Sequence, residues 1–326
     1  MRNYIIRRFL LMIPTLLLVS MIIFLIVRLV PGDVIDAMAA EWGDVGDIDR
    51  AMIEKALGLD VPIFVQYGRW LGVVPRGDGS FSGIFQGDFG KSLWTTKTVT
   101  KLLSQRLPVT IELGLMGLII AQLIALPIGL ISALRQDSWG DYLGRSFAII
   151  CIAVPGFWLA TMAIVFPSIW WGWSPPIMLI RFSDDMLGNL GMFIVPAIML
   201  GMSMSGVTMR MTRTMMLEVL RQDYIRTAWS KGLKERIVII RHALRNALIP
   251  VVTIVGLQVP IMVGGTVIIE QIFNLPGVGR LMVDATIKRD YPVISGVMFI
   301  LGAIILLNNL VVDLTYGVLE PRTRLD

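Results

Sequence analysis

Long uncharged apolar runs recur along this chain, and they restrict its fold more than any other feature. The first run, from Phe9 to Val27, is long enough to cross a bilayer, which takes about 20 helical residues. Hydrophobic residues make up 55% of the chain and charged residues 16%, and the mean hydropathy is +0.74. Because backbone N–H and C=O groups must bond to one another inside lipid, the sequence predicts an all-α integral membrane protein.

Six apolar segments of this kind are expected to span the membrane. After the first, they run from about Leu113 to Leu134, Ser146 to Trp170, Leu190 to Met209, Ala247 to Ile269 and Val293 to Val312. Pro155-Gly156 interrupts the third segment, which is permitted only where neighbouring helices or a cavity satisfy the backbone. The first segment is too long for a typical signal-peptide core and no small-residue cleavage site follows it, so we expect it to be retained.

Basic residues gather at the ends of the apolar segments and set the expected orientation. Nine bases against three acids lie between Arg210 and Arg245, and Arg2, Arg7 and Arg8 precede the first segment. Cytoplasmic loops are enriched in Lys and Arg, so we expect both termini and residues 210–246 in the cytoplasm. This pattern accounts for the net charge of +5 better than nucleic-acid binding does.

The chain is expected to divide into three parts. Residues 1–30 would hold the cytoplasmic N-terminus and the first transmembrane helix. Residues 31–108, in which acids cluster early, would form an extracytoplasmic segment with a short helix near Ile48 to Leu57. Residues 109–326 would form a core domain with five transmembrane helices.

A basic stretch from Tyr224 to Pro250 lies between two strongly apolar segments. Gly232 interrupts it, and glycine costs about 1 kcal/mol in a helix interior, so we expect two short helices that meet at a turn there. The second helix has apolar residues at three- and four-residue spacing. They are Ile237, Ile240, Leu244 and Leu248. Pro250 is expected in the first turn of the following helix, where no backbone N–H is needed.

Two motifs in this stretch carry a family resemblance. They are Asp223-Tyr224-Ile225-Arg226-Thr227-Ala228, followed by Lys231-Gly232-Leu233, and Arg241-His242-Ala243-Leu244-Arg245-Asn246-Ala247-Leu248-Ile249-Pro250. They look like the coupling loop of the B-type permeases in the dipeptide, oligopeptide and nickel group of binding-protein-dependent ABC importers. Trp229 departs from the pattern, at a position where a small or basic residue is expected. The resemblance covers nearly the whole chain.

The resemblance implies the six-helix type I ABC importer fold with a MetI-like core, in which a coupling loop at about 217–249 docks into a groove on a cytoplasmic ATPase. The docking residues that it implies are Tyr224, Ile225, Arg226, Thr227, Ala228, Lys231, Gly232, Leu233, Arg241, His242 and Arg245. It also implies a multi-pass location in a prokaryotic cytoplasmic (inner) membrane. The implied partners are a second related permease, two ATP-binding subunits and an extracytoplasmic solute-binding protein.

The mechanism implied by the resemblance is ATP-driven import by alternating access, with this chain forming half of the translocation path. Peptides are the favoured substrates, and nickel chelates or oligosaccharides are the alternatives within the same role. This chain would bind no cofactor, because ATP and Mg²⁺ would lie on the partner ATPase subunits.

The sequence offers no arguable catalytic or metal-binding set. It has one histidine, His242, and one cysteine, Cys151, and no complete phosphate-loop motif. We therefore expect a non-catalytic subunit without a metal. A remote alternative, an ion-coupled secondary transporter, would need carboxylates within the spans, but Glu112, Glu270 and Asp313 lie at span ends.

Four residues of the fifth apolar segment are candidates for the substrate path. They are Gln258, Pro260, Gly264 and Gly265. Broken helices near the midplane of transporters often bind or pass substrate. The structural alternative is that Gln258 bonds across helices, as buried amides in membranes commonly do.

Overall fold

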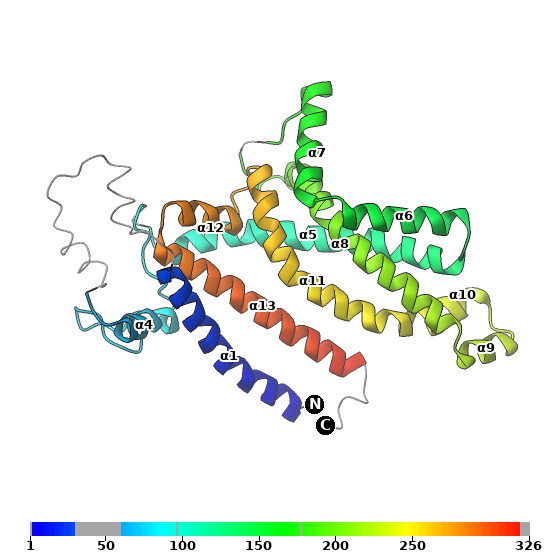
Figure 1. Cartoon of the computed structure of the whole chain (residues 1–326), viewed down its shortest axis with the longest axis horizontal. Coiled ribbons are helices and arrows are strands. Elements are labelled where there is room, and N and C mark those ends of the chain that lie inside the picture. Colours follow the sequence, from blue (N-terminus) through cyan, green and yellow to red (C-terminus); the bar gives the residue numbers. More distant parts are fainter. Residues whose placement is uncertain (1, 30–59, 96, 177, 320–326) are drawn as a thin grey trace. The chain divides into compact units, whose positions relative to one another are not determined.

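The computed structural model describes residues 2–29, 60–95, 97–176 and 178–319, and their regular elements are helices (Figure 1). An isolated antiparallel bridge pairs Lys91 with Thr98. The helix expected near Ile48 to Leu57, and the early acids around it, lie outside the described residues. The all-helical fold class predicted from the apolar runs is confirmed.

Within the described residues, five helices are long and apolar enough to cross a membrane. They are α1 (Arg2–Leu29), α5 (Val99–Leu134), α8 (Met186–Leu220), the helix that runs from Glu235 to Ile272, and α13 (Tyr291–Leu319). A sixth span results if α6 (Trp139–Ala153) and α7 (Gly156–Trp171) cross together, as a pair bent by 96°. The six predicted spans therefore correspond to five single helices and one bent pair.

Several helices begin before the apolar run that predicted them. α5 begins at Val99, upstream of the expected Leu113, and α6 begins at Trp139, upstream of the expected Ser146. Hydropathy registers only the lipid-facing length of a helix, whereas capping decides where it starts. At α6 the cap is Ser138, whose side chain accepts a hydrogen bond from the Asp141 backbone N–H.

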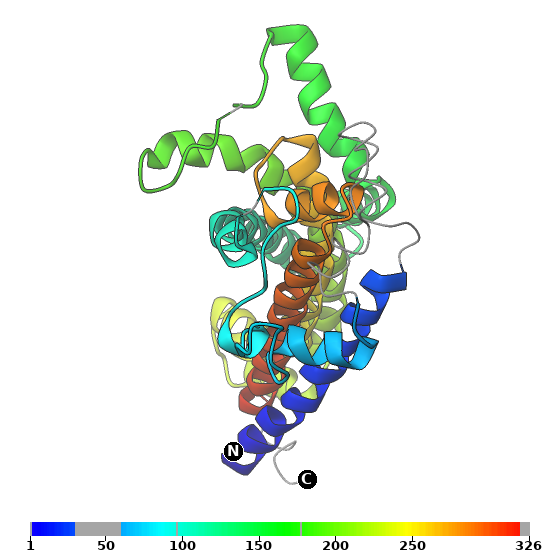
Figure 2. The ribbon, with the colours of Figure 1, turned by 90° about the vertical axis from the view of Figure 1, so that its left-hand side faces the viewer.

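The break between α6 and α7 follows from Pro155. A proline has no backbone N–H and pushes the preceding residue out of the helical region. Val154 accordingly has extended backbone angles, φ −83° and ψ 126°, and α7 starts at Gly156. Figures 1 and 2 show α7, in green, turning away at this point. The predicted interruption is confirmed.

The chain forms two compact units. Unit 1 comprises Met1–Ile6, Thr110–Pro276 and Leu307–Asp326. Within it α8 is central, because it packs against α6, α7 and α11 (Arg245–Ile272). Glycines allow close crossings, since a Cβ built on Gly201 would lie 2.7 Å from the Gly117 carbonyl oxygen, and one on Gly206 would lie 2.8 Å from that of Ala148. Small residues of this kind let membrane helices approach closely.

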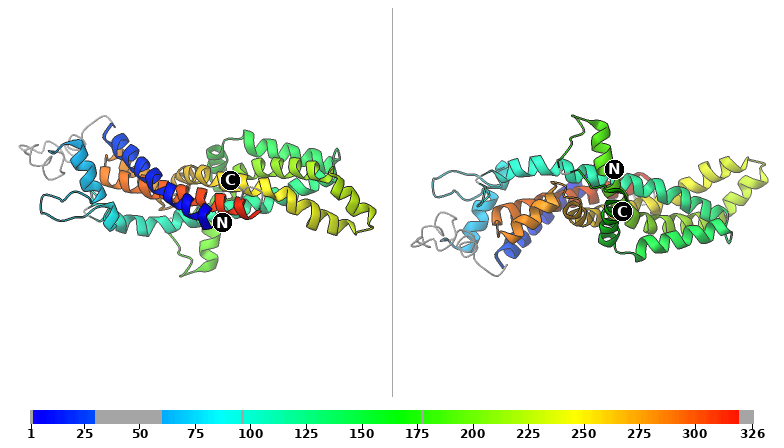
Figure 3. Two further views of the ribbon diagram at one scale, coloured as in Figure 1. Left: turned by 90° about the horizontal axis from the view of Figure 1, so that it is seen from below. Right: turned by 90° about the horizontal axis from the view of Figure 1, so that it is seen from above.

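Unit 2 comprises Arg7–Val109 and Gly277–Leu306. It contains α1, α4 (Ile63–Leu71), the 3₁₀ turn η1 (Ile84–Gln86), α12 (Val278–Ile287) and most of α13. α1 and α13 run side by side (Figures 1 and 3), and their contact includes Ile23, Val27 and Val297 in one buried cluster. The placement of residues 31–108 outside the membrane stays a prediction.

Candidate functional site

The residues that link α8 to α11 form two helical pieces joined by a turn. We call residues 217–249 the coupling segment. It includes α9 (Asp223–Ser230), α10 (Glu235–Ile237) and a π-helical stretch, η2 (Val238–Leu244). Figure 3 shows this segment, in yellow-green, at one end of unit 1. The two helices predicted around Gly232 are confirmed.

Gly232 makes the turn. Its φ is +72°, in the left-handed region that side-chain-bearing residues rarely adopt, and its N–H donates to the Trp229 carbonyl at 2.9 Å. A Cβ added there would meet no atom within 4 Å. Within this chain the glycine is therefore required by backbone conformation rather than by lack of space.

The second helical piece continues directly into α11. α10, η2 and α11 follow one another without a break, so the expectation that Pro250 opens a new helix is wrong. Pro250 lies inside α11 and cannot donate to the carbonyl of Asn246, one turn earlier. Ala247 and Val251, each 1% exposed, are buried on either side, and their packing holds this stretch helical despite the lost bond.

One face of the coupling segment is buried against its own unit. Ile225 and Ala228 of α9 pack in one apolar cluster with Val238 and Ala243 of η2. The same cluster includes Ala247, and it reaches Ala133 of α5 and Met216 of α8. The segment is thus fixed to the ends of two long helices, so a force applied to it acts directly on them.

The segment also exposes large apolar side chains. They are Tyr224, Trp229, Leu233, Ile237 and Ile240, with exposed fractions from 36% to 49%. We call these five residues the exposed apolar face. Of the predicted apolar stripe, Ile237 and Ile240 are exposed, whereas Leu244 and Leu248 are half-buried. A cluster of exposed apolar residues on a charged segment is typical of a protein interface.

The charged residues of the segment are little used by the fold. Arg226, Lys231, Arg241 and Arg245 are exposed, and His242 is half-buried. Arg226 lies 3.5 Å from the Asp223 carboxylate, but the two side chains are 75% and 96% exposed, and such pairs contribute about 0–1 kcal/mol. These cations remain accessible to a partner.

The segment has one polar contact between its helical pieces and another within α9. The Asn246 side-chain amide donates to the Tyr224 hydroxyl at 2.8 Å, which ties α9 to α11. The Thr227 hydroxyl donates to the Asp223 carbonyl at 2.9 Å within α9. Of the predicted docking residues, Ile225 and Ala228 therefore hold the segment in place, whereas the others are exposed or half-buried.

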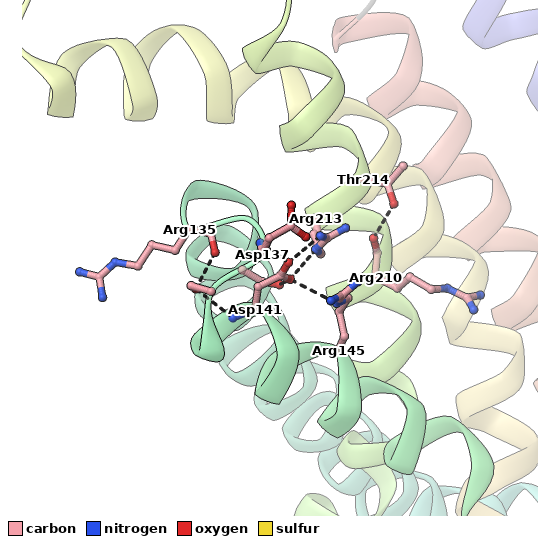
Figure 4. A network of polar contacts seen from close by, with 9 residues as sticks. Arg135, Asp137, Asp141, Arg145, Arg210, Arg213 and Thr214 are labelled. Carbon is pink, nitrogen blue, oxygen red and sulfur yellow. Dashed lines mark hydrogen bonds and ion pairs between the residues drawn. The ribbon is translucent and has the colours of Figure 1, made fainter.

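A buried ion pair near the segment was missed from the sequence. Asp141 of α6 is fully buried and accepts two hydrogen bonds from Arg213 of α8, at 2.7 and 2.8 Å (Figure 4). The Ser132 hydroxyl and the Asp137 backbone N–H also donate to this carboxylate. The pair joins α6 to α8 three residues before Met216 of the apolar cluster. The only sequence signal was that Asp137 and Asp141 lie between two bases, Arg135 and Arg145, in a short link between apolar segments.

Gln258 bridges two helices. It is 4% exposed, and its Nε2 donates to the Met204 carbonyl and to the Thr208 hydroxyl of α8, each at 3.0 Å. Its Oε1 has no partner among the described residues. Pro260 and Gly265 are half-buried and Gly264 is exposed. The cross-helix bonds match the structural alternative, and the substrate-path role stays a prediction.

The described part of the chain holds no group of three or more His, Cys, Asp or Glu residues arranged to bind a metal ion. Its single described cysteine, Cys151, is buried in α6. The features that the site offers are therefore an anchored helical segment, an exposed apolar face and accessible cations. Such an arrangement suits recognition of another protein.

Comparison with solved structures supports the fold. The chain is similar to the MetNI methionine ABC transporter in an inward-facing conformation, with a TM-score of 0.55, 16% identity, and 68% of this chain and 97% of that chain covered. It is also similar to an amino acid ABC transporter, with a TM-score of 0.50, 15% identity, and 68% and 94% covered. The type I ABC importer fold expected from the sequence is thereby confirmed.

Comparison with curated proteins gives relatives over nearly the full length. A putative peptide transport system permease protein of Brucella abortus is 40% identical over 314 residues, 96% of each chain. The oligopeptide transport system permease protein AppB of Bacillus subtilis is 40% identical over 326 residues, 99% of each. The glutathione transport system permease protein GsiC of Salmonella typhimurium is 36% identical over 324 residues, 99% of each.

Two family descriptions match the chain. Residues 1–114 match the N-terminal part of the binding-protein-dependent transport system membrane component. Residues 125–325 match the binding-protein-dependent transport system inner membrane component. This range contains the coupling segment and the Asp141–Arg213 pair. This chain therefore belongs to the family of binding-protein-dependent transport system inner membrane components.

Proposed function

We propose that this chain is the permease subunit of an ATP-driven ABC importer for peptides. The observation that carries the proposal is identity of 36–40% over nearly full length with relatives whose names denote peptide, oligopeptide and glutathione transport. Glutathione is itself a small peptide, so the three names agree on one chemical class.

The proposed complex contains a second related permease, two ATP-binding subunits and an extracytoplasmic solute-binding protein. This chain would form half of the translocation path and hydrolyse no ATP. ATP would drive alternating access only if it binds one conformation of the complex better than the other, because a ligand with equal affinity for both states shifts nothing.

The coupling segment is proposed to transmit this energy. The exposed apolar face would seat in a groove of an ATP-binding subunit, as an amphipathic helix does in other helix-in-groove complexes. Its buried face packs against Met216 of α8 and Ala133 of α5. Movement of the ATPase subunits would therefore reach the spans through apolar packing.

Transport by the reconstituted complex tests this function. The chain would be placed in liposomes with the proposed ATP-binding subunits, second permease and solute-binding protein, and uptake of labelled di- to pentapeptides would be measured. We expect uptake that needs ATP and the binding protein and that unlabelled peptides inhibit. Uptake of nickel chelates or oligosaccharides without competition by peptides would contradict the substrate class.

Orientation has its own test. With Cys151 changed to alanine, Ser80→Cys in unit 2 and Ser230→Cys in the coupling segment would each be treated with an impermeant thiol reagent in intact cells. Both serines are exposed. We expect labelling of the first before lysis and of the second only after lysis. The reverse pattern would contradict the proposed orientation.

A further inference from the structure

A cavity of about 330 Å³ lies between α6 and α8 in unit 1. Its lining contains both arginines and apolar residues. The residues that define this character are Arg145, Arg210, Arg213, Ala148, Ile149 and Ile152. Its lining differs from the apolar cluster of the coupling segment and from the hydrogen-bonded surroundings of Gln258.

The three arginines outnumber the two acids near them, Asp137 and Asp141. Arg213 is engaged by Asp141 through two hydrogen bonds, and Asp137 also lies near it (Figure 4). Arg145 makes a longer contact with the same Asp141 carboxylate, at 3.6 Å, and its side chain is 39% exposed. Its guanidinium lies 4.5 Å from the ring centre of Tyr142.

Arg210 extends away from the Asp141 contacts in Figure 4. Its guanidinium forms no ion pair with the described residues. Arg210, together with the partly paired Arg145, therefore leaves positive charge at the cavity that the carboxylates of Asp137 and Asp141 do not fully neutralise.

The apolar side of the cavity continues along α6. Ile149 and Ile152 follow Arg145 by four and seven residues, so the three side chains share one face of the helix. The two isoleucines are 64% and 45% exposed. A guanidinium next to an exposed apolar strip fits a ligand with an anionic head and a hydrocarbon tail.

We propose that this cavity binds the phosphate of an anionic phospholipid of the cytoplasmic leaflet, with an acyl chain against Ile149 and Ile152. The choice of leaflet rests on the orientation in the proposed function. Guanidinium groups bind phosphate oxygens through paired, charge-assisted hydrogen bonds. Basic pockets between membrane helices on the cytoplasmic side suit lipid headgroups of this charge. A water-soluble phosphate would leave the isoleucines uncovered.

Native mass spectrometry of the full importer complex, extracted from bilayers of equal phosphatidylglycerol and phosphatidylcholine, tests the proposal. We expect the wild-type complex to retain phosphatidylglycerol about tenfold over phosphatidylcholine, and the Arg145→Gln, Arg210→Gln double variant to lose that preference. Arg135→Gln is the matched control, because its side chain points away from the cluster (Figure 4), and it should keep the preference. The corresponding double lysine variant, which keeps the charge, should retain most of it.

A second arm separates lipid from free phosphate. Inorganic phosphate, added at the same concentration as the lipid, should not displace phosphatidylglycerol, and Ile149→Ser should weaken retention without changing the charge. Equal retention of the two lipids by wild type, unchanged retention in the double glutamine variant, or displacement by phosphate would each overturn the proposal. Loss of the ATPase from the purified complex would instead count against the proposed function, since the proposed lipid site is formed by residues of this chain.

Discussion

The coupling segment of unit 1 and residues 60–98 of unit 2 are both polar connections between apolar helices, yet they are fixed in different ways. The coupling segment is anchored by apolar side chains such as Ile225 and Val238, while its charges are exposed. Residues 60–98 are anchored by polar contacts as well as by apolar packing of Trp70 and Phe89. The Ser92 hydroxyl donates to Asp290 at 2.6 Å, and Arg28 donates to Gln66 at 2.6 and 2.9 Å.

Polar and charged groups in residues 60–98 help to maintain the fold, whereas those of the coupling segment are accessible to a partner. In unit 2 Ser92 and Asp290 are buried and bonded to each other, so removing one leaves the other without this hydrogen bond. Aromatic contacts of Trp70 with Phe24 and Phe299 reinforce the same region. In the coupling segment, by contrast, the cations can change without loss of packing. Accessible charge beside an exposed apolar face is what a docking surface requires.

Removing an apolar anchor of the coupling segment should have the largest effect. Ile225 is 1% exposed, and Ile225→Ala should destabilise the segment by about 2–5 kcal/mol through lost burial and the cavity left behind. Hydrogen exchange of the coupling segment in nanodiscs would report the change. Ile240→Ala, at a 49% exposed position, is the control and should leave exchange nearly unaltered. Equal exchange in the two variants would contradict the apolar anchoring.

Removing a polar anchor of unit 2 should have the second-largest effect. Asp290 is 4% exposed and accepts from Ser92 and from the Leu93 backbone N–H, so Asp290→Ala should cost about 1–3 kcal/mol. Protease sensitivity of residues 60–98 would measure it, with Lys97→Ala as an exposed control. A sensitivity no greater than that of the control would show that the polar contacts do not hold this region.

The same carboxylate predicts a pH dependence. Burial raises the pKa of Asp290 above its usual value of 3.8, against the opposing effect of the hydrogen bonds from Ser92 and Leu93. The folded state therefore binds this proton more tightly than the unfolded state. Its contribution is full below pH 3.8 and is lost as pH rises through the raised pKa. Asp290→Asn should flatten that slope in denaturant titrations, and an unchanged slope would contradict this assignment.

A substitution at the turn should cost less but affect coupling. Gly232→Val forces a β-branched residue into positive φ, at a strain of about 1–3 kcal/mol, in a place where no described atom obstructs the side chain. Insertion and abundance should be normal, while substrate-stimulated ATPase activity of the reconstituted complex falls. Lys234→Gln alters a charge without altering the backbone and should be nearly silent. Full activity of the valine variant would refute the role of the turn.

The smallest effect is expected for an exposed ion pair. Arg226→Gln breaks the 3.5 Å contact with Asp223 and should change the free energy of unfolding by no more than about 0.5 kcal/mol. Thermal unfolding of the purified complex would check this. A shift as large as that of Asp290→Ala would erase the contrast between the two regions.

The parts that could be predicted from the sequence are those set by local patterns. Apolar runs located the spans, Pro155 located the bend, and Gly232 located the turn. Helix ends were harder to predict from the sequence, because α5 begins at Val99, well before its apolar run. The Asp141–Arg213 pair joins residues 72 apart in the chain, and no local pattern specifies which helices will meet.

Binding of the ATP-binding subunit to the permease complex, measured in nanodiscs at physiological salt, tests the central claim most directly. Two double variants would be compared, Ile237→Ser with Ile240→Ser, and Lys231→Gln with Arg241→Gln. Because a few apolar anchors dominate helix-in-groove binding, we expect the serine pair to weaken affinity about tenfold or more and the glutamine pair to change it by less than about threefold. Loss of affinity in the glutamine pair with full binding by the serine pair would contradict docking through the exposed apolar face.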